Sequence, residues 1–249
     1  MKHALFGRAA ERYDLHTPPH HYQHDHQFVL ELLNDLPSGS RLLDVGCGTG
    51  VFLERALEKG LDACGIDATR EMVTVARRRV GPDRVEHRRM QDLTETSSMA
   101  AVVSLCWSFN YCRSMAEATE TVAAFHRALV PGGILVLQVA HAPHATGELL
   151  EDREPGPDGT PDDVLFLYRF HRPPRTKTVL WADYVYACRS LDELVHERHE
   201  LHGADVLALG DVASETGFDR IEIFDDWHRR PLTRSISPFL VARKRSISP

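Results

Sequence analysis

Short apolar runs alternate with amphipathic stretches through the first half of the chain. The apolar runs have the length of buried strands, and the stretches between them carry apolar residues at helical spacing. We expect strands at residues 41–45, 63–67, 84–89, 101–106 and 134–139, and helices at 27–36, 51–59, 70–80 and 116–130. This alternation predicts a parallel sheet with helices on both faces.

The pattern changes after Ala140, where a polar loop rich in Pro and Gly at 151–161 leads into longer β-prone segments. These segments, at 164–171, 179–189 and 193–201, predict a small antiparallel meander. A helix at 210–216 and strands at 219–225 and 238–244 then complete the sheet.

The predicted fold is therefore α/β: a Rossmann-like, seven-stranded and mostly parallel sheet with helices on both faces, plus a small antiparallel β meander inserted after the fifth strand. In sheets of this kind, ligands bind at the carboxyl ends of the strands. Candidate site residues are thus sought where the strands end.

The composition is that of an ordinary globular protein, with 43% hydrophobic and 26% charged residues among 249. We expect one domain with an insertion. No run of about 18 apolar residues occurs, and the first residues lack the apolar core of a secretory signal. We therefore expect a cytoplasmic protein without a membrane partner.

The formal net charge of −7 argues against a nucleic-acid partner, because binding to a phosphate backbone relies on clustered Lys and Arg. The basic runs at 77–79 and 88–89 are short, and we expect them on solvated helix faces. The five cysteines are scattered without a C-x-x-C pair, so we expect small buried hydrophobic residues rather than disulfides or a thiolate zinc site.

The most informative segment is LLDVGCGTG at 42–50, a strand that leads into a glycine-rich turn. Glycine allows backbone angles that a Cβ forbids and lets main-chain N–H groups approach a ligand. The spacing is G-x-G-x-G rather than the G-x-G-x-x-G of dinucleotide-binding turns, which disfavours NAD. Asp67 closes the next apolar run about 20 residues later, where a carboxylate can bind ribose hydroxyls.

These residues resemble class I S-adenosylmethionine-dependent methyltransferases, through 42–50, GIDATREMVTVAR at 65–77 and LVPGGILVLQV at 129–139. The resemblance covers residues 41–140. It implies S-adenosylmethionine as cofactor and S-adenosylhomocysteine as product. The sulfonium already activates the methyl group, so the protein's tasks are positioning, exclusion of water and removal of a proton, and no metal is required.

The resemblance also implies where the cofactor lies. Asp44, Gly46 and Gly48 are expected along the methionine part, Asp67 on the ribose hydroxyls, and Ala68 and Met72 against the adenosine. Met72 has a plain alternative as helix core, because methionine fills gaps in any core.

At the adenine end the chain departs from its relatives, since Arg89 occupies a position where many have an Asp. An arginine cannot accept the exocyclic amino protons. Met90 can offer its backbone N–H to the ring, and Gln91 or Asp92 can supply the acceptor. Asp92 has the alternative role of capping the following turn.

The fourth strand ends where the family places residues beside the transferable methyl. Cys106 is expected on the cofactor, and Trp107 and Tyr111 are expected to pack an apolar or cationic acceptor. Both aromatic residues have the alternative of simply covering the edge of the sheet.

The antiparallel addition and the Tyr-rich amino-terminal helix resemble the small-molecule branch that includes glycine N-methyltransferase and the amino-sugar N,N-dimethyltransferases. In those relatives the amino-terminal segment lies over the cofactor, and the added strands form the substrate chamber or a dimer contact. The expected units are an amino-terminal helical lid at 1–40, a cofactor domain at 41–145 and 203–245, an inserted substrate or dimer subdomain at 146–202 and a tail at 246–249.

The lid is rich in tyrosine and histidine. The resemblance places Tyr13 and Tyr22 on the cofactor and His16 and His21 near its methyl end, beside the substrate. His20 and His24, one helical turn apart, are too few for zinc, which takes three or four ligands from separated elements. We therefore expect no metal.

The candidate general bases are His141 and His144, which follow the fifth strand. An imidazole pKa of about 6.5 suits proton removal near neutrality. Both residues have the alternative of being loop histidines without a catalytic role. On the added strands, Arg169 and Tyr184 are candidates for selecting a polar group of the substrate.

The leading hypothesis is methyl transfer to an oxygen or nitrogen of a small molecule, as in natural-product or antibiotic biosynthesis, by a protein that can form a homodimer. One alternative is a peptide or protein methyltransferase, in which the extended strands offer an edge to a substrate backbone. Another is a cofactor-binding regulatory protein without catalysis.

Overall fold

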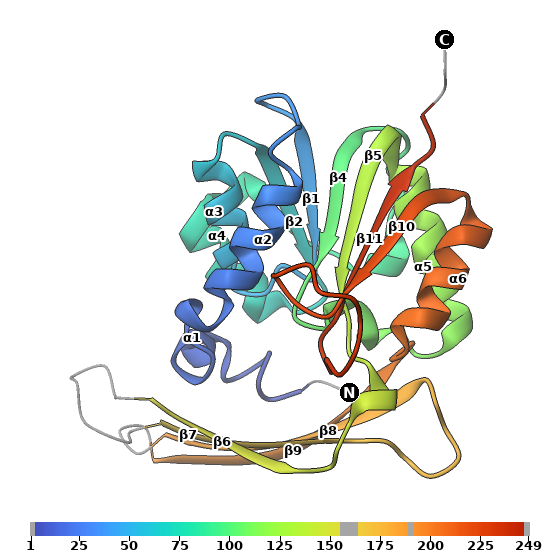
Figure 1. Cartoon of the computed structure of the whole chain (residues 1–249). Coiled ribbons are helices and arrows are strands. Elements are labelled where there is room, and N and C mark those ends of the chain that lie inside the picture. Colours follow the sequence, from blue (N-terminus) through green and yellow to red (C-terminus); the bar gives the residue numbers. More distant parts are fainter. Residues whose placement is uncertain (1–2, 155–163, 189–191, 247–249) are drawn as a thin grey trace.

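Two β-sheets of different kind organise the computed structural model (Figure 1). The structure describes residues 3–154, 164–188 and 192–246. The larger sheet has seven strands in the order β10-β11-β5-β4-β1-β2-β3, and the smaller one has four in the order β6-β7-β8-β9. In the larger sheet, β11 alone runs antiparallel to its neighbours.

The strands of the larger sheet come from both ends of the described chain. They are β1 (Arg41–Val45), β2 (Asp62–Asp67), β3 (Val85–His87), β4 (Met99–Ser104), β5 (Leu129–Gln138), β10 (Phe218–Phe224) and β11 (Phe239–Lys244). Those of the smaller sheet follow one another: β6 (Leu149–Glu154), β7 (Val164–His171), β8 (Val179–Cys188) and β9 (Glu193–His202).

The helices divide into α-helices and short 3-10 turns. The α-helices are α1 (Tyr13–His16), α2 (Gln23–Leu32), α3 (Val51–Glu58), α4 (Arg70–Val80), α5 (Met115–Ala128) and α6 (Val206–Thr216). The 3-10 turns are η1 (Ala10–Arg12), η2 (Pro19–Tyr22), η3 (Pro82–Arg84), η4 (Met90–Asp92), η5 (Ser108–Tyr111) and η6 (Ala142–His144).

Strand alternation sends neighbouring side chains into two separate core layers. Leu42 belongs to the layer under α2, α3 and α4, whereas Leu43 belongs to the layer under α5 and α6. Ile134 and Leu135 of β5 divide in the same way. Because both faces of these strands are buried, their sequences are almost continuously apolar, as the sequence pattern predicted.

The strand order switches sides at β1: β2 pairs with one edge of β1, and β4 pairs with the other. Such a switch point leaves a crevice at the carboxyl ends of the two strands. The loop after β1 and the turn after β4 both open into this crevice.

The four-stranded sheet lies beneath those carboxyl ends, and the first described residues run between the two sheets (Figure 1). Leu5 and Ala9 pack against Phe166, Tyr186 and Val195 of the smaller sheet. The amino-terminal segment, residues 3–22, therefore forms part of the layer between the sheets.

The predicted fold class is confirmed, but some element boundaries are wrong. Strand β6 starts at Leu149 and runs into residues 151–154, which we expected to belong to a loop, because β7 supplies hydrogen-bond partners along its length. The remainder of that loop (155–161), residue 189 of the predicted strand 179–189 and most of the predicted tail lie outside the described residues.

Other differences concern the ends of elements, among them those of α2, which spans Gln23–Leu32 rather than 27–36. The strand expected at 84–89 is only Val85–His87, because it pairs at the sheet edge with β2 alone and η3 precedes it. Helix α6 begins at Val206 rather than at 210, since Asp205 accepts a hydrogen bond from Leu207 N and caps it.

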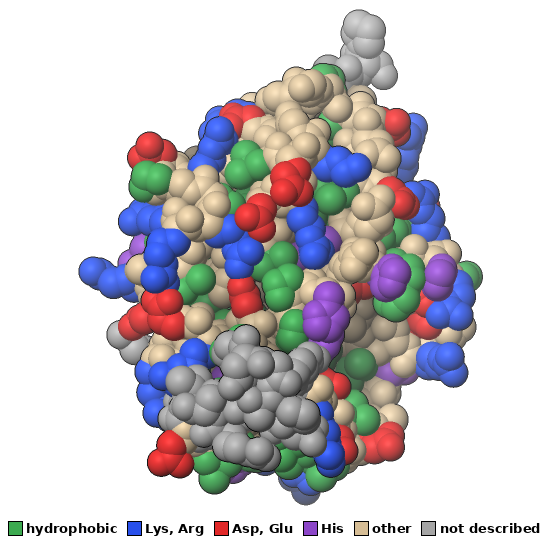
Figure 2. Space-filling model, turned by 90° about the vertical axis from the view of Figure 1, so that its left-hand side faces the viewer, with side chains coloured by type: hydrophobic (Ala, Val, Ile, Leu, Met, Phe, Trp, Pro, Cys, Tyr) green, Lys and Arg blue, Asp and Glu red, His purple; other side chains and the backbone are tan. Residues whose placement is uncertain are grey.

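The charges do not gather by sign on the face seen in Figure 2, where basic and acidic side chains lie beside one another. Among the described residues, no helix combines the length and the apolar character that a membrane crossing requires.

Candidate active site

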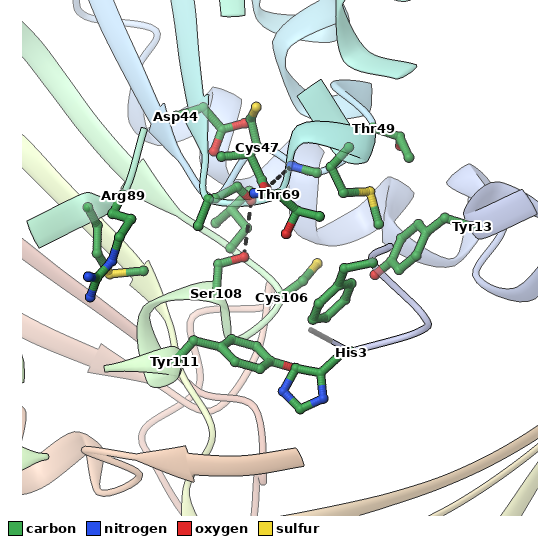
Figure 3. A pocket seen from close by; sticks show the side chains of 18 of the residues that line it. His3, Tyr13, Asp44, Cys47, Thr49, Thr69, Arg89, Cys106, Ser108 and Tyr111 are labelled. Atoms are coloured by element: carbon green, nitrogen blue, oxygen red, sulfur yellow. Dashed lines mark hydrogen bonds between the residues drawn. The ribbon is translucent and has the colours of Figure 1, made fainter. Parts of the chain in front are cut away.

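A cavity of about 1020 Å³ lies at the carboxyl ends of β1, β2 and β4 (Figure 3). Its wall combines the glycine turn after β1, the start of α4, the turn after β4, the amino-terminal segment and the last part of β9. Ligand pockets usually measure about 300–1,000 Å³, so this cavity has room for two small molecules together.

The glycine turn forms one wall of the cavity and is held by the end of β2. Gly46 N and Cys47 N both donate to Ile66 O, at 2.8 and 3.1 Å. Gly46 has a φ of +75°, and a Cβ built there would lie 2.4 Å from Ser108 Cβ. A Cβ on Gly48, in contrast, would meet nothing within 4 Å, so the backbone is open to a ligand there.

Asp67 joins the glycine turn after β1 to the start of α4. Its carboxylate accepts hydrogen bonds from Gly48 N at 3.0 Å and from Thr69 N at 2.8 Å. Burial raises the pKa of Asp67, although these bonds act in the opposite direction. Burial and the nearby Asp67 raise the pKa of Asp44 to about 8. The site thus holds two buried carboxylates, which favours a ligand that is cationic or rich in hydrogen-bond donors.

Most residues expected on the cofactor line this cavity. They are Tyr13, Tyr22, Asp44, Gly46, Gly48, Asp67, Ala68, Met72, Met90 and Cys106. Gln91 and Asp92 do not line it, although they follow Met90 directly in η4. The amide of Gln91 instead lies 3.9 Å from Cys112 Sγ. The expected adenine acceptor is therefore not brought to the cavity by either residue.

The turn after β4 is strained where it enters the cavity. Cys106 and Trp107 adopt positive φ values of 50° and 64°, a conformation that is uncommon for non-glycine residues. Cys106 N donates to Gln138 Oε1 at 3.0 Å, which holds the turn in place. Cys106 is exposed and Cys64 is half-buried, so the expectation that all cysteines are buried is wrong for these two residues.

The residues expected on the acceptor do not gather in one place. Tyr111 lines the cavity. Trp107 lies outside its lining: the indole N–H donates to Ser237 Oγ at 2.9 Å, and the ring packs against Phe170. Trp107 thus covers the sheet edge, the alternative stated above.

The two amino-terminal histidines that we expected beside the substrate, His16 and His21, also lie outside the cavity lining. His16 is buried with its ring 4.6 Å from that of Tyr186. His21 is exposed and contacts His20. The geometry gives no support to either residue as a substrate contact.

Arg169 and Tyr184 occupy opposite faces of the smaller sheet. Arg169 donates to Asp183, its register partner across the strand pair, at 3.0 Å. Tyr184 follows Asp183 in the chain, so strand alternation turns it to the other face, where it packs 4.9 Å from the ring of His199. Tyr184 supports the cavity wall from behind, whereas Arg169 faces away.

His141 and His144 do not reach the cavity. His141 is 1% exposed, and its Nδ1 accepts a hydrogen bond from Val206 N at 3.2 Å. Burial lowers the pKa of His141. His144 lies beside it and donates to Ser235 O at 3.0 Å. The pair anchors the start of α6 and the loop before β11, and the expectation of a general base at these two positions has no geometric support.

Several lining residues had no signal in the sequence. His3 and Phe6 line the cavity from the amino-terminal segment, and Arg113 does so after η5. Thr49 in the glycine turn donates to Asp14 at 2.7 Å. Arg79 pairs with Asp14 and donates to Thr49 O at 2.9 Å, so this member of the run at 77–79 fastens the segment to the turn and is not merely solvated.

One group within the described residues has the composition of a metal site. His3, Glu197 and His199 have ligand atoms within 4.8 Å of one another. The rings of the two histidines overlap, however, with centroids 3.7 Å apart and planes tilted by 32°. Lone pairs lie in the ring plane, so two overlapping rings direct them side by side rather than toward one ion. This arrangement disfavours metal binding.

The comparison with protein families finds a methyltransferase domain over residues 16–198. A dTDP-3-amino-3,4,6-trideoxy-alpha-D-glucopyranose N,N-dimethyltransferase of Streptomyces venezuelae is 38% identical over 103 residues, which are 41% of this chain and 43% of the relative. The match thus spans less than half of that relative. A malonyl-[acyl-carrier protein] O-methyltransferase of Salmonella typhimurium is 28% identical over 82% of this chain and 83% of its own.

Solved structures show the same fold. DesVI from Streptomyces venezuelae superposes with a TM-score of 0.72 at 23% identity and covers 94% of this chain and 96% of its own. The sugar N-methyltransferase KedS8 from Streptoalloteichus has a TM-score of 0.71 at 24% identity, with 90% and 88% covered.

Proposed function

The chain belongs to the methyltransferase domain family, in the class I branch that uses S-adenosylmethionine, and we propose that it methylates a nitrogen or oxygen of a small molecule. The observation that carries this proposal is the cavity itself. It joins the glycine turn and Asp67 on one side to the aromatic wall of Phe6, Tyr13 and Tyr111 on the other.

The residues present fit the cofactor. Gly48 offers open backbone, and the two buried carboxylates suit a ligand with hydroxyl donors and positive charge. A nearby cation favours the ionised form of Asp44, whose pKa is otherwise raised. We propose that Gly46 and Gly48 bind the methionine part, Asp67 the ribose hydroxyls, and Met72 and Met90 the adenosine.

When bound, S-adenosylmethionine supplies a methyl group that its sulfonium already makes electrophilic. The remaining work falls to the chain, which must hold the acceptor in line, exclude water and accept a proton. Tyr13 and Tyr22 close the cavity from the amino-terminal segment. We propose that residues 1–40 act as the lid, 41–145 and 203–245 as the cofactor domain, and 146–202 as the acceptor subdomain.

An amine or hydroxyl on a sugar is the acceptor class that we favour. The relatives named above act on an amino sugar and on a carrier-bound malonyl group, respectively. The aromatic wall suits stacking against a sugar ring or a nucleobase. The pathway class of natural-product biosynthesis and a homodimer stay predictions.

Calorimetry with S-adenosylmethionine and S-adenosylhomocysteine tests the cofactor assignment. We expect both to bind, and absence of binding would refute the proposal. Transfer of labelled methyl to amino-sugar nucleotides, simple sugars and peptides then tests the acceptor. Labelling of peptides alone would favour the protein methyltransferase, and binding without any transfer would favour the regulatory alternative.

A further inference from the structure

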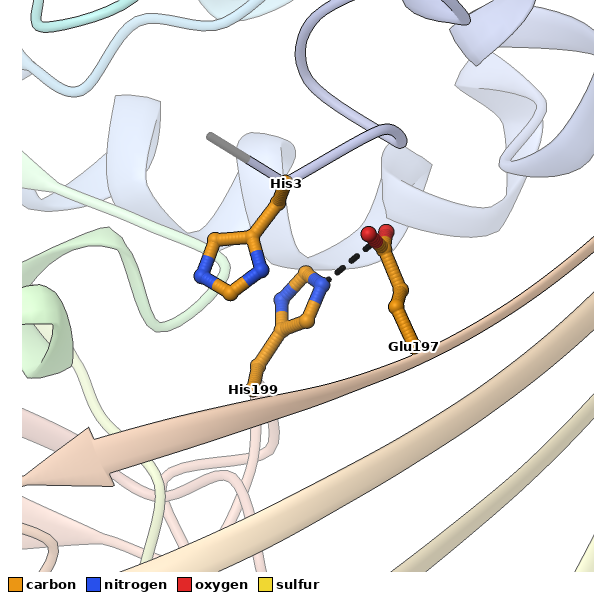
Figure 4. Close-up of side chains that lie close together, drawn as sticks. All are labelled: His3, Glu197 and His199. Atoms are coloured by element: carbon orange, nitrogen blue, oxygen red, sulfur yellow. Dashed lines mark ion pairs between the residues drawn. The ribbon is translucent and has the colours of Figure 1, made fainter. Parts of the chain in front are cut away.

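A network of polar side chains extends from the cavity wall into the smaller sheet. Tyr111 lines the cavity, and its hydroxyl lies 2.5 Å from His199 Nδ1. His199 is fully buried, and its Nε2 lies 3.0 Å from Glu197 Oε1 (Figure 4). Among the described residues, Tyr111 alone was both expected on the acceptor and lines the cavity.

The carboxylate of Glu197 determines which groups of this network donate a proton and which accept one. The backbone N–H groups of Ala4 and Leu5 donate to Glu197 at 2.7 and 3.0 Å. Burial raises the pKa of Glu197, but His199 and these amides outweigh it and hold the pKa below its ordinary value. Nε2 of His199 lies 3.0 Å from this carboxylate without the geometry of a hydrogen bond. A bare nitrogen lone pair so close to a negative charge would be repelled, so we infer that Nε2 carries the proton. Nδ1 is then bare and accepts the hydrogen bond of the Tyr111 hydroxyl.

We propose that Tyr111, His199 and Glu197 form a proton relay that deprotonates the methyl acceptor. The inference rests on the proposed function. Tyr111 touches the acceptor, and His199 and Glu197 are positioning residues that act through it.

Methyl transfer and the transfer of the acceptor's proton to His199 occur together. The acceptor's lone pair forms the bond to the methyl carbon while the bond from that carbon to sulfur breaks, leaving its electron pair on sulfur. The acceptor's proton passes to the Tyr111 oxygen as the Tyr111 proton passes to His199 Nδ1. The carboxylate of Glu197 stabilises the resulting imidazolium. The proton returns through Tyr111 to solvent after product release.

Tyr111 cannot serve as base by itself, because burial raises its pKa well above the ordinary value and keeps the phenol neutral. The imidazole behind it supplies the basic site. The titratable groups that face His199 are Glu197 on its own strand, His3 from the amino-terminal segment, Tyr111 after β4 and Tyr184 on β8. Burial and His199 lower the pKa of His3 to about 4, so His3 adds no positive charge near neutrality.

The tests compare Tyr111→Phe and Glu197→Gln with Tyr168→Phe, a control tyrosine on the same sheet outside the relay. For Tyr111→Phe we expect kcat to fall by about 100-fold or more, with unchanged cofactor affinity by calorimetry. For Glu197→Gln we expect a smaller loss, and the acidic limb of the pH–rate profile moves to lower pH, because the imidazolium loses its counter-charge. Tyr168→Phe should retain kcat within about twofold.

A measurement without cofactor separates this inference from the proposed function. Imidazole ¹⁵N NMR of the cofactor-free protein should show His199 protonated at Nε2 and bare at Nδ1, with the Nδ1 signal shifted in Tyr111→Phe. The opposite tautomer would overturn the relay, as would full kcat in a folded Tyr111→Phe. Activation of the wild type by Zn²⁺ with loss on chelation would overturn it in favour of a metal site at His3, Glu197 and His199.

Discussion

The two sides of the cavity are built in opposite ways. On the cofactor side, residues 42–72 form one continuous stretch of β1, the glycine turn, α3, β2 and the start of α4. Asp67 reaches Gly48 across only 19 positions. On the acceptor side, Tyr111 and His199 lie 88 positions apart, and Ala4 and Glu197 lie 193 apart. Local chain geometry specifies the first side, whereas packing of distant segments assembles the second.

The largest effect that tests this comparison is expected at Asp67. Replacing it with Ala removes the acceptor of two backbone N–H groups and the expected ribose contact, so the affinity for S-adenosylmethionine should fall about 100-fold, because bonds to a charged group contribute about 1.5–3 kcal/mol each. Asp62→Ala is the matched control, an exposed carboxylate on the same strand that pairs with Arg84. Equal affinity of both variants in calorimetry would show that Asp67 does not contribute to cofactor binding.

Gly46→Ala tests how tightly the turn after β1 is coupled to the turn after β4. The new Cβ would meet Ser108 at a φ that disfavours any side chain, so we expect a loss of about 3 kcal/mol, or roughly 6–12 °C in Tm. Gly39→Ala has nearly the same φ with no atom within 4 Å and should lose only about 1 kcal/mol. Equal melting temperatures would show that the contact with Ser108 does not constrain the turn.

His141→Ala distinguishes support from catalysis on the acceptor side. Removing the Nδ1 acceptor leaves Val206 N without its partner at the start of α6, which should cost about 1–3 kcal/mol of unfolding free energy. The rate of methyl transfer per folded molecule should stay within about twofold, in contrast to Tyr111→Phe. Thermal melting and kcat measured on the same preparation check both points. A loss of kcat at unchanged stability would return the base to His141.

The smallest effect is expected on the outer face of the smaller sheet. Arg169→Gln removes an exposed ion pair with Asp183, which Arg198 also binds, so stability should change by about 0.5 kcal/mol or less. The KM for the acceptor should not change. A rise of more than about fivefold in that KM would show that the outer face also takes part in acceptor recognition.

Fold and cofactor side were accessible from the sequence because their signals are short-range. Strand runs buried on both faces are apolar whatever surrounds them, and a turn that needs positive φ values requires glycine at Gly46 and Gly48. Strand β6 was not predicted, because its residues 151–154 are polar and form a strand by pairing with β7. An edge strand of this kind depends on a partner more than on its own composition.

The acceptor side escaped sequence analysis for a related reason. His141 and His199 look alike as isolated histidines, yet one accepts from the backbone of α6 and the other lies between Tyr111 and Glu197. Spacing along the chain carries no information on such contacts, since they join residues 88 and 65 positions apart on different elements.

By itself the sequence determined the strands and helices of the larger sheet, the glycine turn and the carboxylate at the end of β2. Each of these depends on the chain within a few residues. Only the tertiary structure decided which histidine lies behind Tyr111, that Arg169 faces away and that the amino-terminal segment holds Glu197 in place. The physical reason is that hydrogen bonds and burial depend on distance in space, and the chain brings distant residues together only by packing its two sheets.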